Sequence, residues 1–159
     1  MKLLLTSAGI TNESIKHALL KLNGKPFEKS SMAFIPTAAN VEPGDKDWLI
    51  DDLSRCKDTG IHSIDIVDIS AIPREMWEPR LLSADIIVVG GGNTYHLMYW
   101  MNKSGLSQIM PELLQTKVYM GISAGSMVQS TNLALSQSTK MYAEYMGNEN
   151  IEKGLGNVH

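Results

Sequence analysis

The chain has 159 residues, of which 43% are hydrophobic and 19% charged, with 13 glycines and a single cysteine. This length fits one globular domain spanning residues 1–159, and the composition excludes collagen-like, disordered and disulfide-stapled chains. The formal charge of -3 is scattered along the chain, which argues against nucleic-acid and membrane partners and leaves small-molecule chemistry or protein contacts.

Five short apolar runs are predicted to form strands up to about residue 130. They lie at Leu3–Leu5, Ala33–Ile35, Ile64–Ile69, Ile86–Val89 and Val118–Gly121. In the third run, alternating isoleucine and aspartate residues indicate a place near the sheet edge. The run at Ile86–Val89 has four β-branched residues and is expected to be central.

Amphipathic segments between these runs predict helices. One is expected between a cap at Thr11 or Asn12 and Gly24, and others over Asp47–Lys57, Thr94–Met101 and Leu106–Leu114. Pro111 is expected to kink or restart the last of these, and the segment between Pro73 and Pro79 to be helical or irregular. Beyond Ser130 the pattern weakens and favours loops or short strands.

This alternation of strand and helix predicts an α/β fold, a three-layer αβα sandwich around a mostly parallel sheet. Ligands in such folds bind at the carboxyl ends of the strands. No run reaches the ~20 apolar residues of a spanning helix. The apolar start is interrupted by Thr6, Ser7 and Gly9, so no signal peptide develops and a cytoplasmic location is expected. Cys56 lies on an apolar helix face, where a buried, inert thiol is expected.

A G-x-S-x-G motif follows the last predicted strand, at Gly121–Gly125, and precedes a helix expected to begin near Ser126. A serine on such a sharp turn is strained, and glycines two residues to either side make room for it. The hydroxyl of Ser123 would stand clear of the sheet, with the N–H of Ala124 pointing to where an oxyanion forms. A plain small-residue turn is the alternative.

A glycine-rich turn, Gly90–Asn93, ends the neighbouring strand. The N–H groups of Gly91, Gly92 and Asn93 can approach a ligand closely and supply a second oxyanion donor or a substrate contact. A phosphate cradle is the competing interpretation, but the spacing matches neither G-x-G-x-x-G nor a P-loop.

These two motifs, with Phe34–Ala38 upstream, resemble the aspartyl dipeptidase (dipeptidase E) and cyanophycinase family of serine peptidases. The resemblance extends to about Ser130. It implies a class I glutamine-amidotransferase-like fold, related to flavodoxin-like folds. It also implies Ser123 as nucleophile, an oxyanion hole at Gly92 and Ala124, and hydrolysis of aspartyl peptides without metal or cofactor.

The resemblance also implies a downstream acid and histidine. His159 is either that histidine or the family histidine is absent, since family members continue through further strands that this chain is expected to lack. For the acid, some relatives carry aspartate near Ser138, and Glu144 is the candidate by likeness to another branch. His96 would line the pocket or simply occupy a helix face, while His17 and His62 are expected on the surface. No spacing suggests a metal site.

Two functions are therefore weighed. The first is a serine-type hydrolase acting on a small peptide. The second is a catalytically impaired family member that binds a small molecule or a protein; a sheet edge left uncovered would favour a homodimer. Glutaminase-like amide transfer shares the fold, but its members use cysteine where Ser123 stands.

Overall fold

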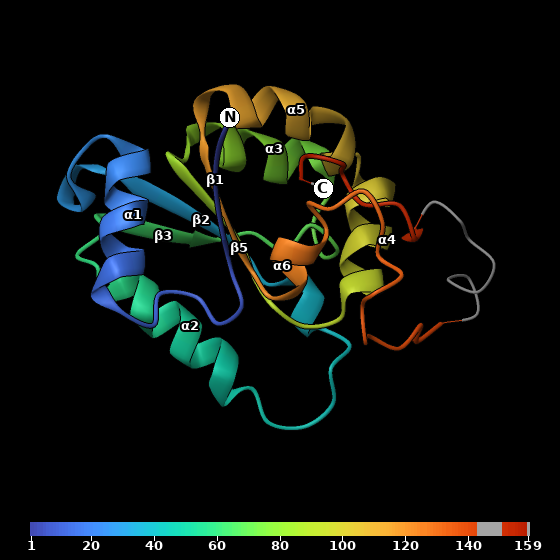
Figure 1. The fold of residues 1–159 in the computed structure, drawn as a ribbon. Coiled ribbons are helices and arrows are strands. Elements are labelled where there is room, and N and C mark those ends of the chain that lie inside the picture. The colour runs from blue at the N-terminus through green and yellow to red at the C-terminus, as the bar shows by residue number, and fades with distance from the viewer. Residues whose placement is uncertain (143–150, 159) are drawn as a thin grey trace.

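The computed structural model describes residues 1–142 and 151–158, and at its centre lies a five-stranded parallel sheet (Figure 1). The strands are β1 (Lys2–Thr6), β2 (Ser31–Ile35), β3 (Ser63–Ile66), β4 (Ile86–Val89) and β5 (Val118–Ile122). Their spatial order is β1-β5-β4-β2-β3. All five predicted strands are confirmed. β3 forms one edge of the sheet as its alternating pattern indicates, and it is shorter than predicted.

The helices lie on the two faces of the sheet, and α1 to α5 connect consecutive strands. They are α1 (Glu13–Asn23), α2 (Asp47–Lys57), α3 (Arg74–Ser83), α4 (Thr94–Ser104), α5 (Leu106–Thr116) and α6 (Ala124–Met127), with short 3-10 turns η1 (Phe27–Lys29) and η2 (Thr37–Ala39). The Asn12 side chain caps α1 by accepting from Ile15 N, and Gly24 ends α1 in a left-handed conformation.

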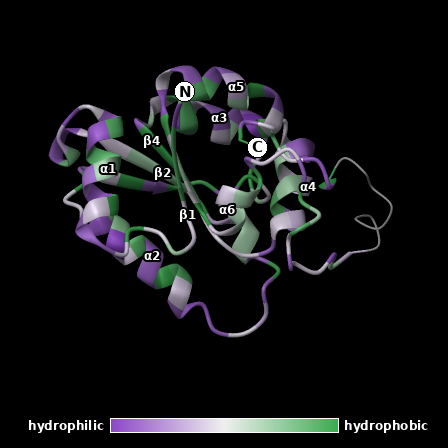
Figure 2. Cartoon of the chain, viewed as in Figure 1, coloured by the Kyte–Doolittle hydropathy of each residue, from purple (hydrophilic) through white to green (hydrophobic). Residues whose placement is uncertain are grey.

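The sheet separates two apolar cores, which makes the architecture an αβα sandwich. On one face, Ile86 and Val88 of β4 pack with Leu19 of α1 and Cys56 of α2. On the other face, alternate strand residues pack against α3, α4 and α5. Figure 2 shows the consequence: the strands are largely hydrophobic, while the helices alternate apolar and polar surface. The predicted fold class is thereby confirmed.

Two proline-containing helices differ from the prediction. α3 continues through Pro79, and α5 continues through Pro111 without restarting. Gly105 separates α4 from α5, in agreement with the two separate helices predicted there. Both prolines lie between buried apolar residues of their own helix, such as Trp77 and Leu81 in α3. Core packing on either side therefore offsets the lost backbone hydrogen bond.

Cys56 is buried, as predicted, and its burial raises the pKa of the thiol to about 12. None of the helices in the described part of the chain has the length and apolar character to cross a membrane.

Candidate active site

The carboxyl ends of β4 and β5 bring the two sequence motifs together. These strands are parallel neighbours, with Val89 opposite Gly121. The glycine turn Gly90–Asn93 leaves β4 at this edge, and Ser123 follows β5. A Cβ placed on Gly91 would lie 3.4 Å from the Cβ of Ser123, so the turn and the serine are in direct contact distance.

Ser123 has an unusual backbone. Its φ of 49° and ψ of -108° make it the one residue other than glycine, among those the structure describes, with positive φ. The next residue, Ala124, begins the one-turn helix α6, earlier than the predicted start near Ser126. The Ser123 side chain is exposed. A non-glycine residue held in this region stores strain of about 1–3 kcal/mol, which is characteristic of functional positions.

The glycines that flank Ser123 are required by close backbone contacts. A Cβ on Gly121 would lie 2.7 Å from the carbonyl group of Gly125, and a Cβ on Gly125 would lie 2.0 Å from the carbonyl oxygen of Val89. Neither position can hold a side chain unless the backbone moves. We call residues 121–125 the elbow. The G-x-S-x-G pattern is therefore required by the close packing of the elbow.

Three side chains that the sequence did not single out secure the elbow. The Tyr119 hydroxyl donates to the Gly125 carbonyl at 2.6 Å, and the tyrosine is fully buried. The Ser126 hydroxyl donates to the Thr6 carbonyl at 2.7 Å and accepts from the Thr6 N–H at 3.0 Å. The Thr6 hydroxyl in turn donates to the Gly121 carbonyl at 2.9 Å. These contacts tie the elbow to β1.

The glycine turn is held from the opposite side by η2. Gly92 has φ of 129°, and a Cβ there would lie 2.2 Å from the Ala38 carbonyl oxygen. The Asn93 N–H donates to the same carbonyl at 2.8 Å. The Asn93 side chain accepts from His96 N and donates to the Thr139 carbonyl. Asn93 thus uses its amide groups to position the turn, while a contact with substrate stays a prediction.

Asp68, which follows β3, holds η2 in place through hydrogen bonds. Its carboxylate accepts hydrogen bonds from Thr37 Oγ1 at 2.8 Å, Asn40 Nδ2 at 2.7 Å and both the N–H and hydroxyl of Ser70. Burial alone would raise the pKa of this carboxyl, but the hydrogen bonds outweigh it and lower the pKa. Asp68 therefore supports Gly92 indirectly, through η2.

Replacing Asp68 with asparagine is expected to lower the free energy of unfolding by about 1–3 kcal/mol at pH 7. Because the native pKa is lowered, the stabilisation by Asp68 is present above its ordinary pKa of 3.8 and is lost as the pH falls below that value. Urea unfolding of both proteins between pH 7 and 3 measures this. The difference in the free energy of unfolding between the unaltered protein and Asp68→Asn should decrease below about pH 4. A difference that stays constant with pH would contradict the role assigned to the carboxylate.

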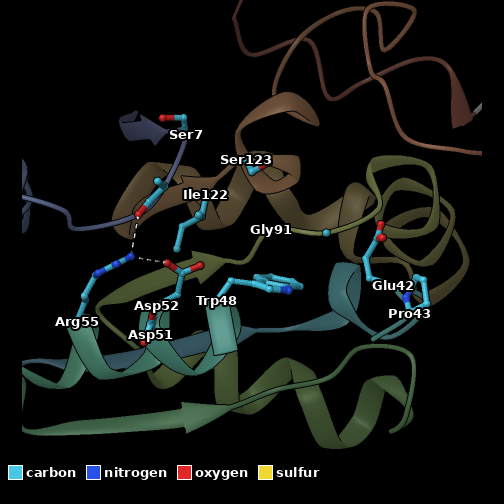
Figure 3. Close-up of a pocket in the computed structure, with 12 residues that line it drawn as sticks. Ser7, Glu42, Pro43, Trp48, Asp51, Asp52, Arg55, Gly91, Ile122 and Ser123 are labelled. Carbon is cyan, nitrogen blue, oxygen red and sulfur yellow. Dashed lines mark hydrogen bonds and ion pairs between the residues drawn. The ribbon is translucent and has the colours of Figure 1, made fainter. Parts of the chain in front are cut away.

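Two cavities of about 490 Å³ each open beside Ser123. The first, the Trp48 cavity, lies between the elbow, the loop after β1 and α2, and Figure 3 shows Trp48 beneath Ser123 with Glu42 to one side. Its lining residues are Ser7, Ala8, Glu42, Pro43, Trp48, Asp51, Asp52, Arg55, Gly91, Gly92, Ile122 and Ser123.

The second, the Ser138 cavity, lies on the other side of Ser123. It is lined by Glu42, Gly92, Asn93, Thr94, Ser123, Met127, Leu135, Ser136, Gln137, Ser138, Thr139 and Met141. Apart from Glu42, the polar side chains that the described residues contribute to it are hydroxyls and amides. The Ser138 hydroxyl accepts from the Thr94 N–H at 3.0 Å and so fastens this segment to the start of α4.

Asp52 is a buried acid at the Trp48 cavity that the sequence did not reveal. Its carboxylate lies 3.5 Å from the Arg55 guanidinium, which also donates to the Ala8 carbonyl at 3.4 Å (Figure 3). Burial raises the pKa of Asp52, while Arg55 opposes the shift. This pair joins α2 to the loop that follows β1, and it shapes one wall of the cavity.

The remaining histidine and acid candidates divide into two groups. His159 and Glu144 lie outside the described residues, so their places relative to Ser123 stay predictions. His96 is buried on α4, with its ring 6.4 Å from that of Trp100, and it belongs to neither cavity lining. Burial lowers its pKa. His17 and His62 are exposed. Within residues 1–142 and 151–158, no three potential metal ligands gather.

Comparison with known proteins places these features in context. A family model described as peptidase family S51 matches residues 3–156. An uncharacterized peptidase of Pasteurella multocida is 31% identical over 108 residues, which cover 67% of this chain and 51% of that protein. Peptidase E of Shewanella oneidensis is 41% identical over 78 residues, covering 47% of this chain and 32% of that protein.

Solved structures agree on the fold. A Listeria monocytogenes protein assigned as a peptidase E superposes with a TM-score of 0.78 at 24% identity, over 97% of this chain and 74% of that one. A peptidase from an acI-B1 actinobacterium gives a TM-score of 0.64 over 99% and 64% of the two chains. The chain spans about half the length, or less, of the curated relatives it matches.

Proposed function

Because the chain belongs to peptidase family S51, we propose that it hydrolyses small peptides, aspartyl peptides in particular, with Ser123 as the covalent nucleophile. The backbone of Ser123 is the observation that carries this proposal. Its strained conformation exposes the hydroxyl at the carboxyl edge of the sheet, between two cavities. A turn with only a structural role would have no need of a non-glycine residue at that strained position.

In the proposed reaction the Ser123 hydroxyl oxygen attacks the carbonyl carbon of the scissile peptide bond while a base takes its proton. The tetrahedral intermediate collapses, the C–N bond breaks, and the leaving amine receives the proton. A water molecule then attacks the acyl-serine ester, which releases the acid product and restores the hydroxyl. No external oxidant or cofactor is needed to balance these steps.

The N–H groups of Gly92 and Ala124 are assigned to the oxyanion. Ala124 is the first residue of α6, where backbone N–H groups lack an intrahelical acceptor. Gly92 belongs to the turn in contact distance of Ser123, and both Ala38 and Asp68 help to fix its position. Donors preorganised in this way stabilise developing charge without reorganising during the reaction.

His159 is assigned as the base and Glu144 as the acid that orients it, giving the chain order serine, acid, histidine. These two assignments rest on the family resemblance. The Ser138 segment, where some relatives carry aspartate, contacts the glycine turn through Thr94 and Asn93. This contact supports a place for the segment beside the reacting groups.

The difference between the two cavities favours one placement of an aspartyl side chain. Among the described residues, the Trp48 cavity is lined by three carboxylates, which would repel it, whereas the Ser138 cavity shares only Glu42 with them and otherwise offers hydroxyl and amide groups that can donate hydrogen bonds. We therefore assign the aspartyl side chain of the substrate to the Ser138 cavity.

A panel of dipeptides tests this substrate class. Asp-Leu should be hydrolysed with a kcat/KM at least about tenfold above that of Asn-Leu, since hydrogen bonds to a charged group contribute about 1.5–3 kcal/mol. Release of free leucine measures the rate. Equal rates for the two peptides would leave a peptidase without aspartyl selectivity, and hydrolysis of neither peptide nor of any other dipeptide would contradict the proposed function.

A further inference from the structure

We propose that Glu42 is a specificity-determining residue, whose carboxylate binds a protonated amine of the substrate beside the nucleophile. This inference rests on the proposed function, because it concerns the same site. It names a charge requirement of the substrate that the aspartyl preference does not include. The loop between η2 and α2, far from both motifs in sequence, supplies the residue.

The position of Glu42 is the first argument. Among the residues that the structure describes, it is the one residue besides Gly92 and Ser123 that lines both cavities. Gly92 and Ser123 belong to the reacting centre, so Glu42 faces the point where the two cavities meet. An amine of the substrate near the scissile bond can therefore reach Glu42 from either cavity.

The charge balance of the Trp48 cavity is the second argument. Among the described lining residues, three are acidic, Glu42, Asp51 and Asp52, and one is basic, Arg55. Arg55 is already directed at the Asp52 carboxylate and the Ala8 carbonyl. Within the described residues, the carboxylates of Glu42 and Asp51 take part in no ion pair. The cavity therefore keeps an excess of negative charge that favours a cation.

Lys46 does not remove this excess. Its ammonium group donates to the backbone carbonyls of Glu42 and Gly44, and it lies outside the cavity lining. These bonds fix the loop that presents Glu42. The lysine thus acts on the backbone of the loop and leaves the carboxylate available to a ligand.

Trp48 is the third argument. The residue is 37% exposed, and its indole lies at the base of the cavity and approaches Gly91, where a Cβ would come within 3.8 Å of the ring (Figure 3). An exposed indole face attracts cations, and the attraction adds to that of neighbouring carboxylates. Carboxylates and an exposed indole together are suited to an alkylammonium group and unsuited to an anion.

The amine can come from the amino terminus of a short peptide or from a lysine side chain, and binding measurements distinguish these sources. The Ser123→Ala variant prevents turnover, so calorimetric titration reports affinity alone. Its ligands are Ala-Ala, N-acetyl-Ala-Ala and N-acetyl-Lys-Ala. Each is titrated into Ser123→Ala, into Ser123→Ala with Glu42→Gln, and into Ser123→Ala with Glu112→Gln. Glu112 is exposed on α5 and supplies a control of equal charge change.

We expect acetylation to weaken the binding of Ala-Ala at least about tenfold, and Glu42→Gln to weaken Ala-Ala similarly while leaving N-acetyl-Ala-Ala unchanged. Glu112→Gln should have no effect. If N-acetyl-Lys-Ala binds about as tightly as Ala-Ala, a lysine side chain can also provide the amine that Glu42 binds. Equal affinity for Ala-Ala and N-acetyl-Ala-Ala, loss of affinity only in the control, or no binding of any ligand would overturn the proposal.

Binding and hydrolysis can fail separately. An amine preference that depends on Glu42, without hydrolysis by the unaltered chain, would support the proposed amine contact and contradict the peptidase activity. Hydrolysis that is indifferent to acetylation of the peptide would support the peptidase and overturn the role of Glu42.

Discussion

Replacing Ser123 with alanine is expected to reduce kcat/KM for peptide hydrolysis by at least about 10⁴-fold, because the variant lacks the oxygen that forms the acyl-enzyme. The fold should survive. The side chain is exposed, and alanine meets the same backbone restriction as serine at a φ of 49°. The free energy of unfolding should therefore change by no more than about 0.5 kcal/mol.

Ser14→Ala provides the matched control for this experiment. Ser14 is exposed on α1, and neither cavity beside Ser123 includes it. Its replacement should leave both hydrolysis and urea unfolding unchanged. A Ser123→Ala protein that keeps more than about one tenth of the activity would exclude Ser123 as the nucleophile, because residual binding and oxyanion stabilisation cannot sustain that rate.

Gly125→Ala is expected to have the largest effect on stability. The added Cβ would lie 2.0 Å from the Val89 carbonyl oxygen and 2.7 Å from its carbon. Both atoms belong to the backbone of β4, which pairs with β2 and β5 and cannot move without disturbing the sheet. We expect a loss of about 3 kcal/mol or more, a large share of the stability of a typical domain.

Gly44→Ala separates this clash from the general cost of replacing glycine. Gly44 has φ of 81°, but nothing lies within 4 Å of an added Cβ. Its replacement should cost about 1–2 kcal/mol, from backbone strain alone. Urea unfolding of the two variants provides the comparison. A Gly125→Ala protein as stable as Gly44→Ala would show that the elbow can shift away from β4, contrary to the rigid geometry described above.

The sequence predicted the fold well because the features that decide it are local. Runs of β-branched residues at Ile86–Val89 and capped, amphipathic helices are visible within short windows. The sequence did not predict that α3 extends past Pro79 or that α5 passes Pro111 without restarting, because the effect of a proline depends on packing against the sheet, which a local pattern does not contain. The helix α6 begins at Ala124, two residues before the predicted start near Ser126, because the chain passes from the turn at Ser123 directly into the helix.

The candidate site was only partly predictable. Ser123 and the glycine turn carry recognisable motifs, since their backbone geometry permits few residue types. Glu42 and Asp52 carry none. Asp52 lies within a helix where a carboxylate suggests a solvent-facing position, yet it is buried against Gly9 and Arg55. Such residues are revealed only when loops that are distant in sequence are placed together.

The most direct test of the central claim is the mass of the intact protein after incubation with a fluorophosphonate, followed by peptide mapping. This reagent forms a covalent adduct with a serine hydroxyl that is activated by a base. We expect one adduct, located on Ser123 and absent from Ser123→Ala. An adduct on another serine, or hydrolysis of peptides without any labelling of Ser123, would contradict this expectation.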